Sequence, residues 1–454
     1  MKPPFYRELY EEAARRAIRY IETVGERRVA PLPGDLDGLA EFGGPVPGDP
    51  CDPVAVLAQL DEIGSPGTMA TSGPRYFGFV TGGALPATVA ASWLATAWDQ
   101  IAGLQVMSPV SAKIEEIASG WLLKLLGLPS SCGVGFVTGA TMANFTALAA
   151  ARHALLGSVG WNVENDGLFG APPLNVVVGA EVHVSLLKAL ALLGLGRERV
   201  VRVPVDGQGR MRAEAMPVLD DRTIVCIQAG NVNTGAFDPA AEICVRAGES
   251  GAWVHVDGAF GLWAAAAPAR AYLAAGVSSA DSWATDCHKW LNVPYDSGLA
   301  FVRRREYMEA SMAMTAAAYL QTNETRQPCH YTPEASRRAR GIEVWAAVRS
   351  LGRRGLAEMI ERHCRLAERF ATRLGEAGFE ILNDVVLNQV LVSFGAPEDT
   401  RRVIERVQAG GVCWCAGTVW QGRVAMRISV SCWQTTEEDV DRSVEAMVEA
   451  AGAD

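Results

Sequence analysis

Residues 280–298 read ADSWATDCHKWLNVPYDSG, and this stretch carries the clearest signal in the chain. Lys289 stands between a short strand-like run, 282–285, and a turn that contains proline and glycine. The amine of a lysine in such a place can bond to an aldehyde cofactor as a Schiff base. The ordinary alternative is a surface lysine whose aliphatic stem covers an apolar patch.

Two further observations favour a chemical role for Lys289. Lysine is rare in this chain, which uses arginine almost everywhere else; the five lysines are Lys2, Lys113, Lys124, Lys188 and Lys289. The segment 252–257, AWVHVD, ends on Asp257 about thirty residues upstream. An aspartate at the end of a strand-like run is a suitable partner for a cofactor that is bonded to lysine.

The run DCHKWLNVPYDSG at 286–298, which follows HVDGAFG at 255–261, resembles the pyridoxal-phosphate-dependent group II amino-acid decarboxylases. This family includes the aromatic amino-acid and glutamate decarboxylases, and the resemblance extends from about residue 66 to the end. It implies pyridoxal 5'-phosphate as cofactor, an amino acid as substrate and a homodimer with shared active sites.

The resemblance also implies fold type I of the pyridoxal-phosphate enzymes. That α/β fold has a large domain with a mostly parallel seven-stranded sheet and a smaller C-terminal α+β domain. We expect an N-terminal helical segment at 1–69, which in the family clamps onto a second subunit. The large domain is then expected at 70–335 and the small domain at 336–454.

Composition limits the class of protein. A net charge of −10 argues against a nucleic-acid partner. The sequence contains no run of 18 apolar residues and no signal-peptide core, so we expect a cytoplasmic protein without a membrane span. The ten cysteines are then expected as reduced thiols, and the spacing of Cys413 and Cys415 does not suit a metal site.

Short β-branched runs alternate with helical stretches between about residues 70 and 310, which predicts a mostly parallel sheet covered by helices. The expected strands are 134–137, 175–178, 200–203, 223–227, 253–256, 282–285 and 299–302. Ligands of such sheets bind at the carboxyl ends of the strands. After residue 340 we expect a long helix, interrupted near Gly352 and Gly355, and then strands at 380–382, 389–394, 412–414 and 424–431.

The segment 136–144, FVTGATMAN, reads as a strand, a glycine turn and a helix start. Free N–H groups at a helix N-terminus bind phosphate, so we expect Gly139, Ala140 and Thr141 to hold the cofactor phosphate. The family has its phosphate loop at this place in the order of motifs. A plain helix cap at Thr138 or Thr141 is the alternative.

Histidine is scarce, and three of the six histidines, His183, His255 and His288, lie in these motifs. We expect His183 to stack on the cofactor ring and to contact the substrate, and His288 to bind the cofactor beside Lys289. Capping of a helix or a loop is the alternative for His183. His255 and Asp257 alternate onto one side of a strand, where His255 can equally serve a structural hydrogen bond.

Asp257 is expected to pair with the pyridine nitrogen of the cofactor, which keeps that nitrogen protonated and makes the ring an electron sink. The alternative is a helix N-cap. Ala259 is small enough to let the ring lie against the chain. Asn233 is assigned to the ring hydroxyl, with a plain turn asparagine as the alternative.

Arg427 lies within an apolar strand-like run and needs a partner if it is buried. It matches the family arginine that binds the substrate carboxylate, and an internal salt bridge is the alternative. In the family, the polar segment 321–336 forms a loop that closes over the partner's active site. Its tyrosine protonates the carbon left by loss of CO₂, and Tyr331, with His330 beside it, is the candidate here.

The favoured reaction is decarboxylation of an L-amino acid by a cofactor bonded to Lys289. Oxidative deamination to an aldehyde, β-elimination of a carbon–sulfur bond and transamination could use the same groups. A catalytically dead binding protein is disfavoured because Lys289 and Asp257 are both present. The side chain of the substrate is not specified by the motifs, and the candidate residues around it are Tyr76, Phe77, Trp98 and Gln100.

Overall fold

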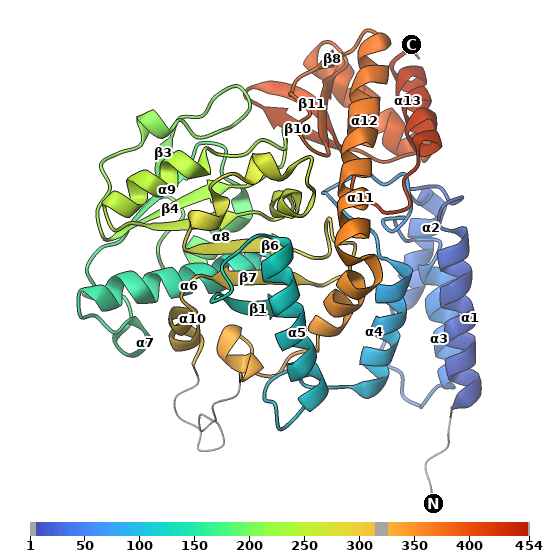
Figure 1. The fold of residues 1–454 in the computed structure, drawn as a ribbon. Coiled ribbons are helices and arrows are strands. Elements are labelled where there is room, and N and C mark those ends of the chain that lie inside the picture. The colour runs from blue at the N-terminus through green and yellow to red at the C-terminus, as the bar shows by residue number, and fades with distance from the viewer. Residues whose placement is uncertain (1–5, 314–325, 453–454) are drawn as a thin grey trace, which may run out of the picture.

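The computed structural model describes residues 6–313 and 326–452. A large α/β domain forms the centre of the molecule, a smaller C-terminal domain covers one end of it, and N-terminal helices run along one side (Figure 1). Within the described ranges, no helix is both long enough and apolar enough to cross a lipid bilayer.

The large domain is built on a seven-stranded sheet in the order β1-β7-β6-β5-β4-β2-β3. β7 runs antiparallel to both of its neighbours, and the other pairs are parallel, which confirms the predicted mostly parallel sheet. The strands are β1 (Gly133–Val137), β2 (Asn175–Gly179), β3 (Val201–Val203), β4 (Thr223–Gln228), β5 (Trp253–Asp257), β6 (Ser282–Asp286) and β7 (Gly298–Val302).

Helices cover both faces of this sheet because successive strand residues point to opposite sides. Val176 and Val178 contact one core, with α6 (Ala140–Ser158) and α8 (Val184–Leu192). Val177 contacts the other core, which includes residues of α5 (Pro109–Leu125) and α9 (Ala240–Glu249). Three further helices belong to the large domain: α4 (Pro86–Trp98), α7 (Val163–Asp166) and α10 (Arg305–Met312).

The C-terminal domain has a four-stranded antiparallel sheet in the order β10-β11-β9-β8, packed against α12 (Pro397–Gly410) and α13 (Glu437–Gly452). Its strands are β8 (Glu380–Ile381), β9 (Gln389–Ser393), β10 (Ala416–Trp420) and β11 (Arg423–Ser429). The sequence pattern had placed a strand at 412–414. That segment instead makes one bridge, between Trp414 and Tyr76, because residues 75–77 lie beside it.

The long helix α11 (Gly341–Glu376) lies where the sequence predicts one, but it joins the two domains, whereas the sequence had assigned it to the small domain. Val344 and Ile360 of this helix belong to the core of the large domain, and Phe370, nearer its C-terminus, belongs to the core of the small domain. Gly352 interrupts the helix with a φ of 61°, a conformation that glycine adopts without strain.

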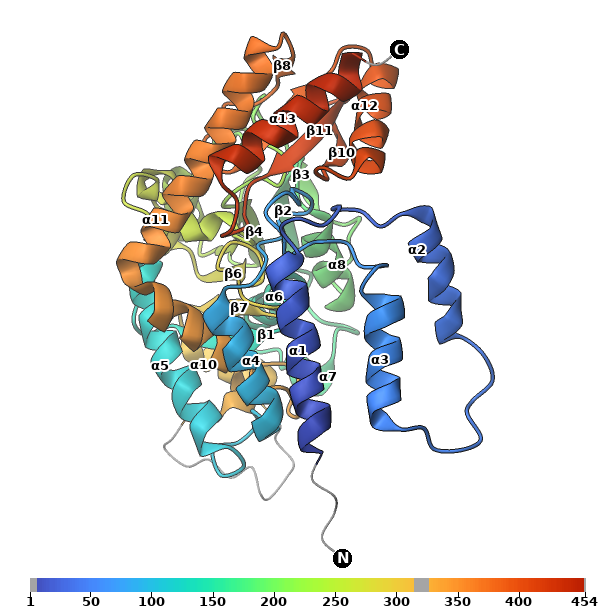
Figure 2. The same cartoon turned by 90° about the vertical axis from the view of Figure 1, so that its right-hand side faces the viewer.

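The N-terminal arm, residues 7–64, comprises α1 (Arg7–Thr23), α2 (Pro33–Gly38), the 3₁₀ helix η1 (Leu39–Phe42) and α3 (Pro53–Gly64). None of these four helices contains a buried residue. In Figure 2, α2 and α3 project away from the rest of the chain. Exposed apolar side chains are common here: Tyr10, Ile18, Ile21, Leu32, Leu36, Phe42, Val54, Val56 and Leu60.

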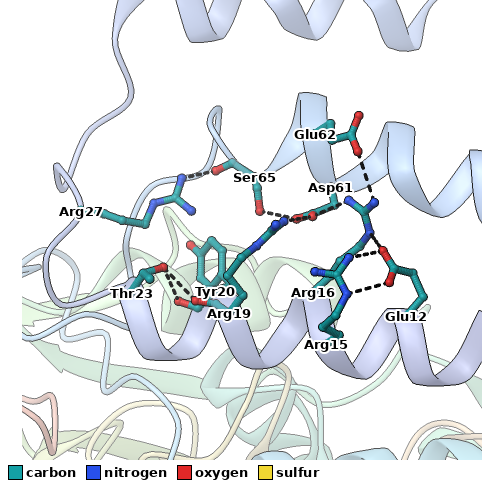
Figure 3. Close-up of polar contacts among 10 residues, drawn as sticks. All are labelled: Glu12, Arg15, Arg16, Arg19, Tyr20, Thr23, Arg27, Asp61, Glu62 and Ser65. Carbon is teal, nitrogen blue, oxygen red and sulfur yellow. Dashed lines mark hydrogen bonds and ion pairs between the residues drawn. The ribbon is translucent and has the colours of Figure 1, made fainter.

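Charged side chains connect the two longer helices of the N-terminal arm (Figure 3). Arg16 of α1 pairs with Asp61 of α3 at 2.8 Å and with Glu12 of its own helix at 2.6 Å. Arg19 also reaches Asp61, at 2.5 Å. The hydrogen bond from Arg15 lowers the pKa of Glu12 to about 2, and Arg16 adds to this effect.

Candidate active site

The residues predicted to carry the chemistry meet at one edge of the large sheet. Asp257 ends β5, Lys289 follows β6, and Gly139 follows β1. These three strands run in the same direction, so their carboxyl ends share an edge. His183 follows β2 at that edge too.

The Lys289 amine lies 3.0 Å from Oδ2 of Asp286, the last residue of β6. The other carboxylate oxygen of Asp286, Oδ1, accepts the backbone N–H of Ala140 at 2.5 Å. Oδ1 also lies 3.3 Å from Nε2 of His288. One buried carboxylate therefore links the lysine to the N-terminus of α6.

The turn before α6 requires glycine because backbone approaches backbone. A Cβ on Gly298 would lie 2.5 Å from Cα of Gly139, and a Cβ on Gly139 would lie 3.0 Å from the His288 ring. The His288 ring is itself fixed, since Nδ1 accepts the N–H of Ser297 at 3.1 Å and Tyr295 stacks on it at 4.3 Å.

Asp257 is buried and hydrogen-bonded on both carboxylate oxygens. Asn144 Nδ2 donates to Oδ2 at 3.3 Å, and the N–H of Ala259 donates to Oδ1 at 3.3 Å. Burial raises the pKa of Asp257, whereas the neighbouring His183 and Lys289 and the Asn144 bond oppose this rise. The two N–H donors and the positive charge of Lys289 favour the carboxylate, against the effect of burial.

His255 lies behind Asp257 and is part of the core. Its Nε2 contacts Asn144 Oδ1 at 2.8 Å, and its Nδ1 contacts Ser282 Oγ at 2.9 Å. Burial lowers its pKa to about 3, so the imidazole is neutral. The geometry is that of the structural hydrogen bond which the sequence left open as one interpretation, and it fixes Asn144 against Asp257.

His183 is the N-cap of α8, where Nδ1 accepts the N–H of Ser185 at 3.3 Å. Burial lowers its pKa, and the positive charges of Lys289 and Arg427 act in the same direction. Since Nδ1 is an acceptor, the neutral ring carries its proton on Nε2. His183 therefore caps α8, which was the alternative to a cofactor role, and it also lies close enough to Lys289 and Asp257 to feel their charges.

Arg427 of β11 points from the small domain toward this cluster. Nη1 donates to Asn233 Oδ1 at 3.3 Å, and Thr418 Oγ1 donates to the same oxygen at 3.1 Å. Burial lowers the pKa of Arg427, Nε is buried without a hydrogen-bond partner, and no carboxylate of the described residues forms an ion pair with it. The internal salt bridge considered from the sequence is therefore not present in the described part of the chain.

Tyr331 is not brought to Lys289 within one chain. Its phenol donates to Glu309 of α10, and the guanidinium of Arg326 lies 4.3 Å from its ring centroid. Its backbone lies against Gly135 in the middle of β1, and it lines a cavity with Gly133 at the start of that strand, away from the carboxyl edge. Residues 321–325 of the predicted loop lie outside the described residues.

The segment 336–340 reads SRRAR, and its three arginines hold parts of the large domain together. Arg337 pairs with the buried Glu115 of α5 at 2.8 Å, and Arg340 pairs with Asp296 at 2.9 Å. Arg338 pairs with Glu343 at the start of α11. Each of the three guanidiniums thus has a carboxylate partner in its own chain.

The four residues suggested for the substrate side chain have different environments. Phe77 belongs to the core of the small domain, where it meets Phe370 at 5.0 Å. Tyr76 stacks on Trp414 at 5.1 Å. Trp98 is exposed at the end of α4, and the Gln100 side chain donates to its carbonyl.

The donor set fits pyridoxal phosphate. The turn at Gly139 presents the N-terminus of α6, Asp257 presents a buried carboxylate, and Lys289 presents an amine at the same edge. Buried polar atoms without a protein partner lie at this edge as well: Ser297 Oγ in the His288 turn and Arg427 Nε. Buried polar groups are rarely left unpaired, so these atoms are suited to a polar ligand.

Comparison with known proteins agrees with this geometry. The family model of the pyridoxal-dependent decarboxylase conserved domain matches residues 46–396. The chain belongs to this family.

Relatives within the pyridoxal-dependent decarboxylases cover most of the chain. An aromatic-L-amino-acid decarboxylase of Bacillus atrophaeus is 28% identical over 80% of this chain and 78% of its own length. An L-2,4-diaminobutyrate decarboxylase of Rhizobium meliloti is 28% identical over 92% of this chain and 84% of its own. The solved structure of Oryza sativa TDC with PLP and tryptamine has a TM-score of 0.89, with 24% identity and 99% of both chains covered.

The protein is therefore a pyridoxal-phosphate-dependent decarboxylase of amino acids, with the fold type I architecture expected from its sequence. Two residues of its candidate site were missed by sequence reasoning. Asp286 stands three residues before Lys289 in the quoted motif, and that spacing was an available signal. Asn144 gave no signal, because only the fold places α6 against β5.

Proposed function

We propose that this decarboxylase bonds its cofactor to Lys289 and acts on an aromatic L-amino acid in a homodimer. The position of the Lys289 amine supports this most directly. Through Asp286 the amine is tied to the N-terminus of α6, and Asp257 lies at the end of the adjacent strand. One sheet edge thus presents a helix N-terminus suited to the phosphate, a carboxylate suited to the ring nitrogen, and a lysine amine suited to the aldehyde.

The cofactor-binding assignments follow from that edge. Gly139, Ala140 and Thr141 are assigned to the phosphate because they form the start of α6. The Ala140 N–H donates to Asp286 Oδ1 in this structure, so it would have to exchange that carboxylate for the phosphate. His288 lies against the same turn and supports it. Asp257 pairs with the pyridine nitrogen.

Three smaller assignments complete the ring site. Ala259 leaves room for the ring, and His183 covers one face of it. Asn233 was assigned to the ring hydroxyl, but its side-chain oxygen accepts hydrogen bonds from Thr418 and Arg427. We therefore propose that Asn233 acts mainly by orienting Arg427.

When bound, pyridoxal phosphate supplies an electron sink for the pair left on the α-carbon when CO₂ departs. The chain's own residues prepare this step. Asp257 holds the proton on the pyridine nitrogen, and His183 with its proton on Nε2 can donate toward the substrate. Arg427 binds the α-carboxylate through a guanidinium that has no carboxylate partner among the described residues.

Aromatic side chains near Lys289 support an aromatic substrate. The segment 76–83 crosses Lys289, because a Cβ on Gly82 would lie 1.7 Å from the Lys289 carbonyl oxygen. Phe79 of that segment is 58% exposed, lies 5.4 Å from Trp414 and has a φ of 54°. Non-glycine residues held at positive φ are frequent at ligand sites. Tyr295, stacked on His288 and 60% exposed, adds a further ring.

The homodimer is supported by the N-terminal arm. Its helices expose apolar side chains and have no buried residue in one chain, so a second chain is a suitable cover.

The role of Tyr331 as proton donor stays a prediction. Within one chain its phenol donates to Glu309, which does not support that role. Cytoplasmic location likewise stays a prediction.

The test is incubation of the purified protein with a panel of aromatic, acidic and basic L-amino acids, with amine, aldehyde, ammonia and CO₂ measured together. Amine and CO₂ in equal amounts from aromatic substrates is the expected result. Release of aldehyde and ammonia would indicate oxidative deamination instead. Reduction with borohydride should fix the cofactor to the peptide that contains Lys289, and label on another lysine would contradict the assignment.

A further inference from the structure

Asp286 is buried, and both polar groups of its backbone are hydrogen-bonded. Its backbone N–H donates to Ala259 O at 2.8 Å, and its carbonyl accepts the indole N–H of Trp263 at 2.9 Å. The side chain is only 3% exposed. The backbone bonds and the burial together restrict where the carboxylate can lie.

The two oxygens of this carboxylate contact different groups. Oδ1 accepts the Ala140 N–H and faces His288, which ties it to the start of α6. Oδ2 contacts the Lys289 amine at 3.0 Å. The lysine side chain is 18% exposed and has four rotatable carbons, so without this contact the amine would occupy many positions.

The chemistry requires Lys289 to leave the cofactor and return. Formation of its bond to the aldehyde replaces the C=O group by C=N and releases one water. Once the cofactor is bound, exchange of the lysine nitrogen for a substrate amine would leave Lys289 as a free amine. After the product amine has formed, Lys289 must take its place back in the same manner.

We propose that Asp286 is a positioning residue, which holds the free Lys289 amine beside the start of α6 and so keeps it ready to return to the cofactor. This rests on the proposed bond between Lys289 and the cofactor. Asp286 acts through Lys289 and does not itself contact the reacting carbon. The contact with Ala140 fixes the carboxylate relative to the phosphate end of the site.

The experiment measures how fast the lysine bond forms. Cofactor is removed from the full-length protein, pyridoxal 5'-phosphate is added back, and samples are reduced with borohydride at intervals. Mass spectrometry of the Lys289 peptide gives the rate. Asp286→Asn keeps the size of the side chain and an oxygen for Ala140, whereas Asp286→Ala removes both contacts.

We expect Asp286→Asn to slow labelling of Lys289 by about tenfold or more, as expected when a long side chain loses its fixed position. Asp286→Ala should be at least as slow. Asp281→Asn is the matched control, because Asp281 lies just before β6 at its opposite end and accepts the Val254 N–H at 2.8 Å. Its labelling rate should equal that of the wild type.

Two outcomes would overturn the proposal. A wild-type rate in Asp286→Asn with a loss only in Asp286→Ala would mean that the residue has a purely structural role. Faster labelling in Asp286→Asn would mean that the carboxylate opposes the cofactor phosphate. If the wild type itself shows no label on Lys289, the proposed function fails, and this result is distinct from either outcome.

Discussion

The N-terminal arm and the carboxyl edge of the large sheet both depend on paired charges, but the surroundings of those charges differ. In the arm, Arg16, Glu12 and Asp61 form a network on helices that have no buried residue. At the sheet edge, Asp257 and Asp286 are buried, and each of their carboxylate oxygens has a hydrogen-bond or ion-pair partner.

The difference shows what each network can do. Ion pairs exposed to water are screened and contribute little to stability. Buried charges are costly to leave unpaired, so their partners are held in one arrangement. The arm can therefore tolerate substitution, whereas the sheet edge can hold a lysine and two carboxylates in fixed positions for catalysis.

Among the substitutions at the sheet edge, Lys289→Ala should have the largest effect on activity. Loss of the amine should lower decarboxylation by roughly 10³-fold or more, because the residue that we propose to bond to the cofactor is absent. Turnover and borohydride labelling are measured together. Lys188→Ala on α8 is the control. Activity close to that of the wild type in Lys289→Ala would remove Lys289 from the mechanism.

Asp257→Asn keeps the shape of the side chain and removes its charge. We expect turnover to fall by about 10²–10³-fold, since the pyridine nitrogen loses its counter-charge. The control is Asp238→Asn, because Asp238 is also buried but accepts only the backbone N–H groups of Met211 and Gln228. Near-normal turnover in Asp257→Asn would show that the ring is activated in another way.

Arg427→Ala should raise KM for the amino acid by about 10–100-fold, which corresponds to the loss of charge-assisted hydrogen bonds to the carboxylate. Cofactor affinity should change little. Arg427→Lys keeps the charge without the planar fork and should have an intermediate KM. A fall in cofactor affinity would instead place Arg427 in the cofactor site.

His363→Gln tests how much a buried titratable group outside the active site contributes to the pH dependence of stability. His363 Nδ1 accepts the indole N–H of Trp290, and burial lowers its pKa to about 3. Below about pH 6.5 the unfolded chain binds a proton here and the folded chain does not, so the histidine costs roughly 1.4 kcal/mol of stability per pH unit down to about pH 3. Denaturant unfolding between pH 6.5 and 4.5 should have a flatter pH dependence in the variant, and an unchanged slope would contradict this account.

Arg16→Gln in the N-terminal arm should have the smallest effect. The thermal midpoint should fall by at most about 3 °C, and added salt should reduce the difference from the wild type because these half-buried ion pairs keep contact with water. Arg15→Gln, which removes only the pairing with Glu12, is the control. A large fall that persists in high salt would mean that these charges are buried in an assembly.

Sequence patterns predicted most of the architecture because periodicity is a local property. The seven strands of the large sheet lie where the β-branched runs placed them, and α11 has its interruption at Gly352. The strand expected at 412–414 was wrong. Its N–H and C=O groups bond to residues 75–77, far away in sequence, and no local pattern reports such a partner.

The sequence by itself determined the residues that have reactive groups and their order along the chain. The sequence pointed to Lys289, Asp257 and the 139–141 turn because each follows a short strand-like run, which is a pattern of neighbouring residues. Only the tertiary structure decided which groups meet. Asp286 reaches both Lys289 and Ala140, and Asn144 joins His255 to Asp257, because α6 lies across the ends of β5 and β6. Tyr331, visible as a motif residue, is held by Glu309 instead, since side-chain contacts depend on packing between distant segments.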